Sequence, residues 1–152
     1  MGRPWGFSLL EAVTALAVAG LALSIAVPRL DGMLRRERVR AATNRLAGDL
    51  ELARMAGVRA GCGAVLRLVA DPRCPRRGGA GYRVALRGSA AVLRASPAQD
   101  GVPVCYEVNA DSIAFDSRGL LAPFNNRTVR AVQGDARDSL TISVMGRVYR
   151  RF

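Results

Sequence analysis

The feature that most constrains this chain is an apolar segment near its start, FSLLEAVTALAVAGLALSIAV at residues 7–27, which carries one charge, Glu11. A helix of this length rises about 30 Å, which matches the hydrocarbon core of a bilayer. A cleavable secretory signal usually has a shorter apolar stretch, then a small-x-small site before a turn. Here the segment runs directly into Pro28 and more helical sequence. We therefore expect a transmembrane helix over residues 7–28.

Glu11 is unusual inside such a segment. A carboxylate within the hydrocarbon core costs about 3 kcal/mol unless it is paired or protonated. Glu11 follows Phe7 by four residues, close to one helical turn. If the chain were cut before Phe7, the new amine would be a cation at a similar depth, and it could pair with Glu11 of a neighbouring copy. The acid therefore indicates lateral packing of membrane helices, with a plain anchor as the alternative.

Residues 29–61 are expected to continue the helix in amphipathic form. Apolar residues recur there at spacings of three and four, namely Leu30, Met33, Leu34, Ala41, Ala42, Leu46, Leu50 and Ala53. Arginines fill the other positions, and we interpret them as a solvated face, with acidic lipid or a neighbouring subunit as alternative contacts. Pro28 should kink the helix, because its ring clashes one turn back and it lacks an N–H. Gly57 and Gly61 predict its end.

From residue 63 the pattern changes to short β-branched or alternating segments separated by Gly, Pro, Asp and Asn. The predicted strands are 64–70, 81–87, 91–95, 102–108, 112–115, 127–132, 139–145 and 147–152, with loops at 71–81 and 116–127. The break at Met145-Gly146 predicts a tight hairpin. The fold class is therefore α+β. A long N-terminal helix, half transmembrane and half amphipathic, packs on a small antiparallel β-sheet domain over residues 62–152.

Composition excludes several kinds of active site. The chain has no histidine, which rules out Ser-His-Asp and Cys-His catalysis and histidine-ligated metals. The glycine-rich stretch at 76–81 lacks the spacing of a P-loop and is expected to be a flexible loop. Four aspartates fall among turn residues, where their side chains commonly bond the backbone, namely Asp111, Asp116, Asp135 and Asp138. We expect no enzymatic activity, no cofactor and no metal.

Charge points to acidic partners. The 23 basic residues are all arginine and face 12 acidic ones, giving a net charge of +11. Such an excess makes a polyanion or an acidic protein a partner worth considering.

The three cysteines contain no C-x-x-C pair and suggest oxidation outside the cytoplasm. If 63–70 is an extended strand, Cys62 and the strand end lie about 26 Å apart, and the four residues back to Cys74 recover at most about 14 Å. A disulfide needs Cα atoms within about 7 Å, so Cys62–Cys74 is disfavoured. Cys105 would then pair with one of the others. We favour Cys74–Cys105, with three buried free thiols as the alternative.

The residues at the start of the apolar segment resemble a processing site. GFSLLE at 6–11 is similar to the Gly-Phe-Thr-Leu-Ile-Glu site of the type IV prepilin and pseudopilin superfamily, and MGRPWG at 1–6 resembles the leader that prepilin peptidase removes. The resemblance implies cleavage between Gly6 and Phe7 and N-methylation of Phe7. It also implies an assembly role for Glu11 and Pro28.

The second half resembles GspH/FimT-type pseudopilins. IAFDSRGLL at 113–121 contains an F-x-x-x-G segment, and LTISVMGRV at 140–148 is similar to their final strand–Gly-Arg–strand hairpin. The implied fold is pilin-like, and the implied function is that of a minor pseudopilin, a structural subunit of the periplasmic pseudopilus by which a type II secretion system exports proteins. The implied partners are other pseudopilins or pilins in a fibre, prepilin peptidase and inner-membrane lipid. The implied location is single-pass in the inner membrane, with residues 62–152 in the periplasm.

The charges that flank the apolar segment predict the opposite orientation. Only Arg3 and the terminal amine precede the segment, whereas five arginines follow closely, at positions 29, 35, 36, 38 and 40. Taken alone, the positive-inside rule would place residues 29–152 in the cytoplasm. We follow the resemblance, because the processing motif is the more detailed signal.

The C-terminal end suggests an alternative function. Arg147, Arg150 and Arg151 beside Tyr149 could grip phosphates and stack a base. FimT-like minor type IV pilins that bind DNA for natural transformation carry a similar Gly-Arg-x-Arg motif. In this chain the second arginine is displaced by one position, so Arg147 should share a strand face with Tyr149 and Arg151 while Arg150 points away. A solvated strand is the other interpretation.

Overall fold

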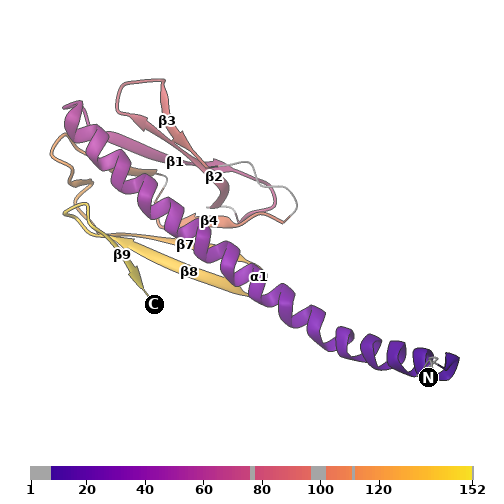
Figure 1. Ribbon diagram of the computed structural model, residues 1–152. Coiled ribbons are helices and arrows are strands. Elements are labelled where there is room, and N and C mark those ends of the chain that lie inside the picture. The colour runs from indigo at the N-terminus through magenta and orange to yellow at the C-terminus, as the bar shows by residue number, and fades with distance from the viewer. Residues whose placement is uncertain (1–7, 76–77, 97–101, 111, 152) are drawn as a thin grey trace, which may run out of the picture. The chain divides into compact units, whose positions relative to one another are not determined.

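The computed structural model describes residues 8–75, 78–96, 102–110 and 112–151. Within these ranges one long helix, α1 (Leu9–Arg59), precedes a set of antiparallel strands (Figure 1). The strands are β1 (Ala64–Ala70), β2 (Gly78–Leu86), β3 (Val92–Ala95), β4 (Cys105–Val108), β5 (Ser112–Phe115), β6 (Leu121–Ala122), β7 (Arg127–Gln133), β8 (Ala136–Ile142) and β9 (Val148–Arg151). This confirms the predicted fold class, a long N-terminal helix packed on a small antiparallel sheet.

The chain divides into two compact units, residues 1–34 and 35–152. The first holds the apolar part of α1, whose large side chains are exposed, among them Leu16, Leu21 and Ile25. By its length and composition, α1 is long and apolar enough to cross a membrane. The helix continues through Pro28, and the kink expected there stays a prediction.

In the second unit, residues 35–59 of α1 lie along one face of the sheet (Figure 1). The helix buries a stripe with spacings of four and three, namely Val39, Thr43, Leu46, Leu50 and Ala53. The last three were predicted. Ala41, also predicted, is exposed, because the buried stripe passes through Val39 and Thr43 instead. The Thr43 hydroxyl is satisfied within the helix, where it donates to the Val39 carbonyl at 2.9 Å.

The strands form one sheet in the order β6-β5-β1-β2-β4-β7-β8-β9, with β3 paired to β2. Side chains alternate between an inner face, which packs on α1, and an outer face, which does not. The inner face supplies most of the core, including Leu66, Tyr82, Phe115, Leu140 and Ile142. β2 changes neighbour along its length, because Gly78 and Gly79 pair with β4 whereas Arg83–Ala85 pair with β3.

Several strand boundaries differ from the prediction; β4, for example, was expected from residue 102 but begins at Cys105. β2 begins at Gly78, inside the expected loop 71–81, because its glycines allow close approach to β1; a Cβ at Gly79 would overlap the Val69 carbonyl. β8 begins at Ala136, so Asp138 lies in a strand rather than in a turn. The short β6 lies within the expected loop 116–127, and two residues carry too little pattern to be detected.

Candidate functional site

Of the two predicted assembly residues, Glu11 lies at the start of α1 and Pro28 lies further along the same helix. Glu11 is exposed in the first turn of the helix, with Leu9 and Leu10 85% and 70% exposed beside it. Its carboxylate makes no ion pair with any described residue. Gly6 and Phe7, the predicted cleavage site, lie outside the described residues. The acid is therefore presented on an apolar helix surface that is open to a neighbour.

The hairpin predicted at Met145-Gly146 is present between β8 and β9. The Ser143 N–H donates to the Arg147 carbonyl at 2.9 Å, and the Gly146 N–H donates to the Ser143 carbonyl at 2.8 Å. β8 ends at Ile142 and β9 begins at Val148, so the connection is longer than the sequence suggested. Gly146 has a φ of +74°, a conformation that residues with a Cβ rarely adopt.

This hairpin packs on the turn that carries the other sequence signature, residues 116–120. A Cβ at Gly146 would overlap the Gly119 carbonyl and lie 2.7 Å from Cδ of Arg54 on α1. The Leu121 N–H also donates to the Val144 carbonyl at 2.9 Å. The F-x-x-x-G segment and the Gly-Arg hairpin therefore form one structural unit, which we call the glycine contact (Gly119 and Gly146).

Asp116 builds the turn that presents Gly119. Its Oδ1 accepts the backbone N–H groups of Arg118 at 2.9 Å and Leu120 at 2.8 Å, and its Oδ2 accepts Nε of Arg118 at 3.1 Å. Desolvation pushes the pKa of Asp116 upward, but these hydrogen bonds together outweigh it and lower the pKa. Asp116 is thus a turn residue, as predicted. Asp111, predicted alike, lies outside the described residues.

The candidate nucleic-acid residues do not all lie on one face of the sheet, because Arg150 and Tyr149 lie on opposite faces. In the β8–β9 register, Tyr149 lies opposite Thr141 on the outer face, whereas Arg150 lies opposite the buried Leu140. Tyr149 is 53% exposed. Arg147 is exposed in the hairpin connection, and Arg151 ends β9. Arg150 thus points away from Tyr149, as strand alternation predicts.

Arg150 has partners that the sequence did not reveal. Its Nη2 donates to Asp138 Oδ2 at 2.6 Å, and its Nη1 donates to Asn44 Oδ1 on α1 at 2.8 Å. Both members of the ion pair are largely buried, with side chains 23% and 14% exposed. Arg150 therefore ties the last strand to the helix. Asn44 and Asp138 are far apart in sequence from each other, so no local signal could have paired them.

We expect Arg150→Ala to lower the free energy of unfolding by about 2 kcal/mol, because it leaves the Asp138 carboxylate largely buried without its charge partner. Chemical denaturation of the full chain in detergent, followed by circular dichroism, measures this. Arg137→Ala is the matched control, since Arg137 is an exposed arginine of the same sheet. Equal losses in the two variants would show that Arg150 has no special structural role.

A second polar contact between the helix and the sheet involves Tyr82, whose ring packs against Tyr106. The Tyr82 hydroxyl donates to Asp49 Oδ2 at 2.6 Å, and the rings of Tyr82 and Tyr106 meet edge to face, 5.4 Å apart. Burial raises the pKa of Tyr106 to about 12. Burial and the hydrogen bond to Asp49 raise the pKa of Tyr82 further.

These pKa shifts predict an alkaline limit to stability. Unfolded tyrosines lose their protons near pH 10, whereas the folded protein holds both protonated, so the stabilisation is complete below pH 10 and is lost as the pH rises above it. We expect Tyr82→Phe to cost about 1–2 kcal/mol at neutral pH and to flatten the alkaline decline. Tyr106→Phe should cost less at neutral pH, because its hydroxyl bonds no described residue. Denaturation curves across alkaline pH check both; a steeper decline in Tyr82→Phe would contradict the assignment.

Cys74 and Cys105 form a disulfide, with Cα atoms 5.6 Å apart. A turn closed by Asp71 positions Cys74, because the Cys74 N–H donates to the Asp71 carbonyl at 3.0 Å. The Asp71 carboxylate accepts hydrogen bonds from the side chain and the backbone N–H of Arg73, and these bonds lower the pKa of Asp71 to about 2.

Cys62 is a free, exposed thiol just beyond α1. Among the described residues, no group of three or more Cys, Asp or Glu could hold a metal ion.

The chain is similar to one protein family in sequence and to solved pilin structures in fold. The profile of the family described as "Type II transport protein GspH" matches residues 42–146, from the packed half of α1 to Gly146. Two crystal structures of the type IV minor pilin FimU of Pseudomonas aeruginosa (strain PAO1) share the fold. The form in space group P21 has a TM-score of 0.63 at 23% identity, over 77% of this chain and 90% of that chain. The form in space group P65 has a TM-score of 0.57 at 24% identity, over 74% and 92%.

No curated protein sequence matches the chain. The FimU structures support the fold alone, since their identity to this chain is low. The family profile covers well over half of the sequence, and it includes the glycine contact. Family and fold are those of pilin-like structural subunits that assemble in a fibre. The chain belongs to the GspH family of type II transport proteins.

Proposed function

We propose that the chain is a minor pseudopilin of a type II secretion system, a structural subunit without enzymatic activity. It would be anchored in the inner membrane by residues 7–28 until it joins a periplasmic pseudopilus used for protein export. The observation that carries this choice is the match to the type II transport protein GspH over residues 42–146. The apolar helix with its single acid supports a role inside a fibre rather than as a free enzyme.

The proposed assembly mechanism uses the start of α1. Prepilin peptidase would cut between Gly6 and Phe7 and leave a methylated Phe7 amine. That cation would pair with Glu11 of an adjacent subunit, which offsets the cost of a carboxylate in an apolar surrounding. The exposed apolar side chains of residues 9–34 would pack in the fibre core, and the sheet domain would lie outside it.

Deletion of the gene in its native host tests the choice of fibre. A pseudopilus subunit should be required for exoproteins to reach the culture supernatant, while twitching and transformation continue. Complementation with the wild-type gene should restore export. Normal export together with lost transformation or lost pili would overturn the proposal in favour of a type IV pilus.

One observation favours the DNA-binding alternative. Tyr149 and Arg147 are exposed near the C-terminal end, where a strand of nucleic acid could reach them. Arg150 is held by Asp138 and Asn44, which weakens the case for a three-arginine site. Titration of the full chain in detergent with duplex DNA across a salt series decides this. A DNA site would show binding that falls steeply with salt and is lost on Arg147→Glu.

A further inference from the structure

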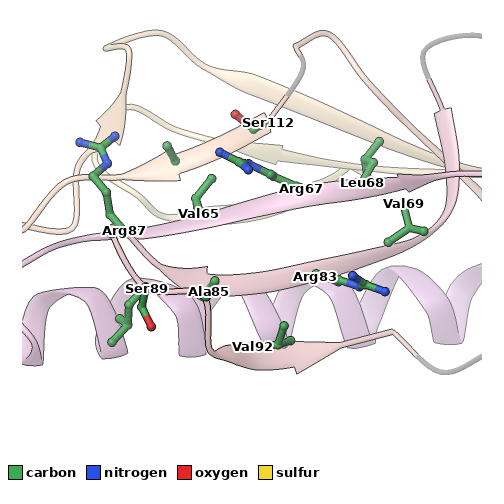
Figure 2. Close-up of a pocket in the computed structure, with 14 residues that line it drawn as sticks. Val65, Arg67, Leu68, Val69, Arg83, Ala85, Arg87, Ser89, Val92 and Ser112 are labelled. Carbon is green, nitrogen blue, oxygen red and sulfur yellow. The ribbon is translucent and has the colours of Figure 1, made fainter.

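The outer face of the sheet carries a hollow of about 680 Å³ that the proposed function does not use (Figure 2). β1, β2, β3 and β5 contribute to it, along with the turn that follows β2. It lies wholly within the compact unit of residues 35–152. Because Leu66 and Val84 on the same strands are buried in the core, the hollow faces away from α1.

Strand register arranges its lining in two rows. One row is apolar, because Val65 lies opposite both Ala114 and Ala85, and Ala85 lies opposite Val92. The adjacent row, about 7 Å away along the strands, is polar. In that row Arg67 lies directly opposite Arg83 on one side and Ser112 on the other. Figure 2 shows both arginine side chains among the residues that line the hollow, with their guanidinium groups extending in opposite directions in this view.

Arg67 and Arg83 are a directly paired set of like charges, which lowers the stability of the sheet when no ligand is bound. Like charges on directly paired residues of neighbouring strands repel and lower stability. Neither guanidinium makes an ion pair with a described residue, and no described acidic side chain lines the hollow, whereas Arg87 adds a third cation at its rim. By contrast, Arg130 on the same sheet lies opposite Glu107 in the β4–β7 register.

We propose that this hollow, the arginine groove (Arg67, Arg83 and Arg87 over Val65, Ala85 and Val92), docks an extended acidic segment of a partner protein. Carboxylates would lie over Arg67 and Arg83, which can bind them bidentately. Small apolar side chains would lie over the neighbouring apolar row. An extended peptide along the boundary between the rows directs alternate side chains to opposite sides, so a sequence of alternating acidic and apolar residues fits both.

Charge and shape select this occupant. A second copy of the chain is a poor donor of acid, because its net charge is +11. Single-stranded nucleic acid would need aromatic side chains on which bases stack, and the lining contains none. A bound carboxylate also relieves the repulsion between Arg67 and Arg83. Peptide binding at this hollow does not require entry into a fibre, so its test is independent of the test of the proposed function.

The test is fluorescence anisotropy with the full chain in detergent. The probe is a fluorescein-labelled peptide of alternating glutamate and valine, about eight residues long, enough to cross four strands spaced about 4.8 Å apart. We expect saturable binding that weakens with salt, and a Kd at least about tenfold higher for the Arg67→Ser/Arg83→Ser double variant. Arg130→Ser, which removes an exposed arginine from elsewhere on the sheet, should leave the Kd within about twofold.

Three results of the binding experiment would overturn the proposal. The first is a matched glutamine–valine peptide that binds with the same Kd as the glutamate–valine peptide. The second is a change in Kd for Arg130→Ser as large as that for the double variant. The third is duplex DNA that binds with higher affinity and displaces the acidic peptide. Arg67→Glu gives an independent measurement that does not depend on a weakened fold. It should abolish peptide binding and raise the melting temperature, because it converts a repulsive cross-strand pair into an attractive one. A lower melting temperature would contradict the repulsion on which the proposal rests.

Discussion

Gly146→Ala should lower the free energy of unfolding by about 3 kcal/mol or more. The substitution carries two costs. Alanine at a φ of +74° is disfavoured by about 1–2 kcal/mol. The new Cβ would also overlap the Gly119 carbonyl and meet Cδ of Arg54 at 2.7 Å, and such overpacking typically adds about 1–3 kcal/mol. Because the Gly119 side of the contact is backbone, it cannot move aside without shifting the turn that Asp116 closes. Chemical denaturation of the full chain in detergent measures the loss.

Gly88→Ala separates these two costs. Gly88 also has a positive φ, +82°, but a Cβ there would meet nothing within 4 Å. Its substitution should therefore report the backbone cost alone, about 1–2 kcal/mol. If both variants lost the same stability, the packing of Gly146 on Gly119 would not explain why the hairpin carries glycine.

Removal of the disulfide is the second large effect. Cys74 and Cys105 are separated by 31 residues, and opening a loop of that size should cost about 3–4 kcal/mol through the entropy of the unfolded chain. The Cys74→Ser/Cys105→Ser variant should show this loss in denaturation experiments under oxidising conditions. Wild-type protein in a reductant should lose a similar amount, because the same covalent constraint is removed.

Cys62→Ser is the control for the thiol chemistry. Cys62 is free and exposed beyond the end of α1, so its replacement should change stability by less than about 0.5 kcal/mol. A large loss from Cys62→Ser, or stability in the double variant equal to wild type, would contradict the pairing of Cys74 with Cys105.

Local patterns predicted the elements of this fold well. The apolar run and the spacing of Leu46, Leu50 and Ala53 gave the long helix, and alternation gave β1 and β5 with their observed bounds. The boundaries that failed depend on contacts between strands. The sequence predicted a loop at Gly78 and Gly79, yet both belong to β2. At Gly79 the backbone of β1 comes too close for a side chain.

The site was less predictable than the fold, because its important pairs are non-local. Strand alternation correctly separated Arg150 from Tyr149, but nothing in the sequence placed Arg150 beside Asp138 and Asn44. The arginine groove depends on the register that sets Arg67 opposite Arg83, and neither residue stands in a recognisable motif. Register is a property of paired strands, so one strand read alone cannot reveal it.

We propose that Glu11 pairs with the Phe7 amine of a neighbouring subunit in a fibre. Glu11→Gln keeps the size of the side chain but removes its charge, and Asp31→Asn is a matched control because Asp31 is an exposed acid further along α1. Mass analysis of the N-terminus should first show that both variants are cut before Phe7 and methylated like wild type. Any difference in assembly then reflects the charge at position 11 rather than processing.

The measurement is the amount of each variant recovered in sheared fibres relative to the membrane fraction. We predict that Glu11→Gln remains in the membrane and is lost from the fibres, while Asp31→Asn enters them as wild type does. Recovery of Glu11→Gln in fibres at the wild-type level would contradict the account.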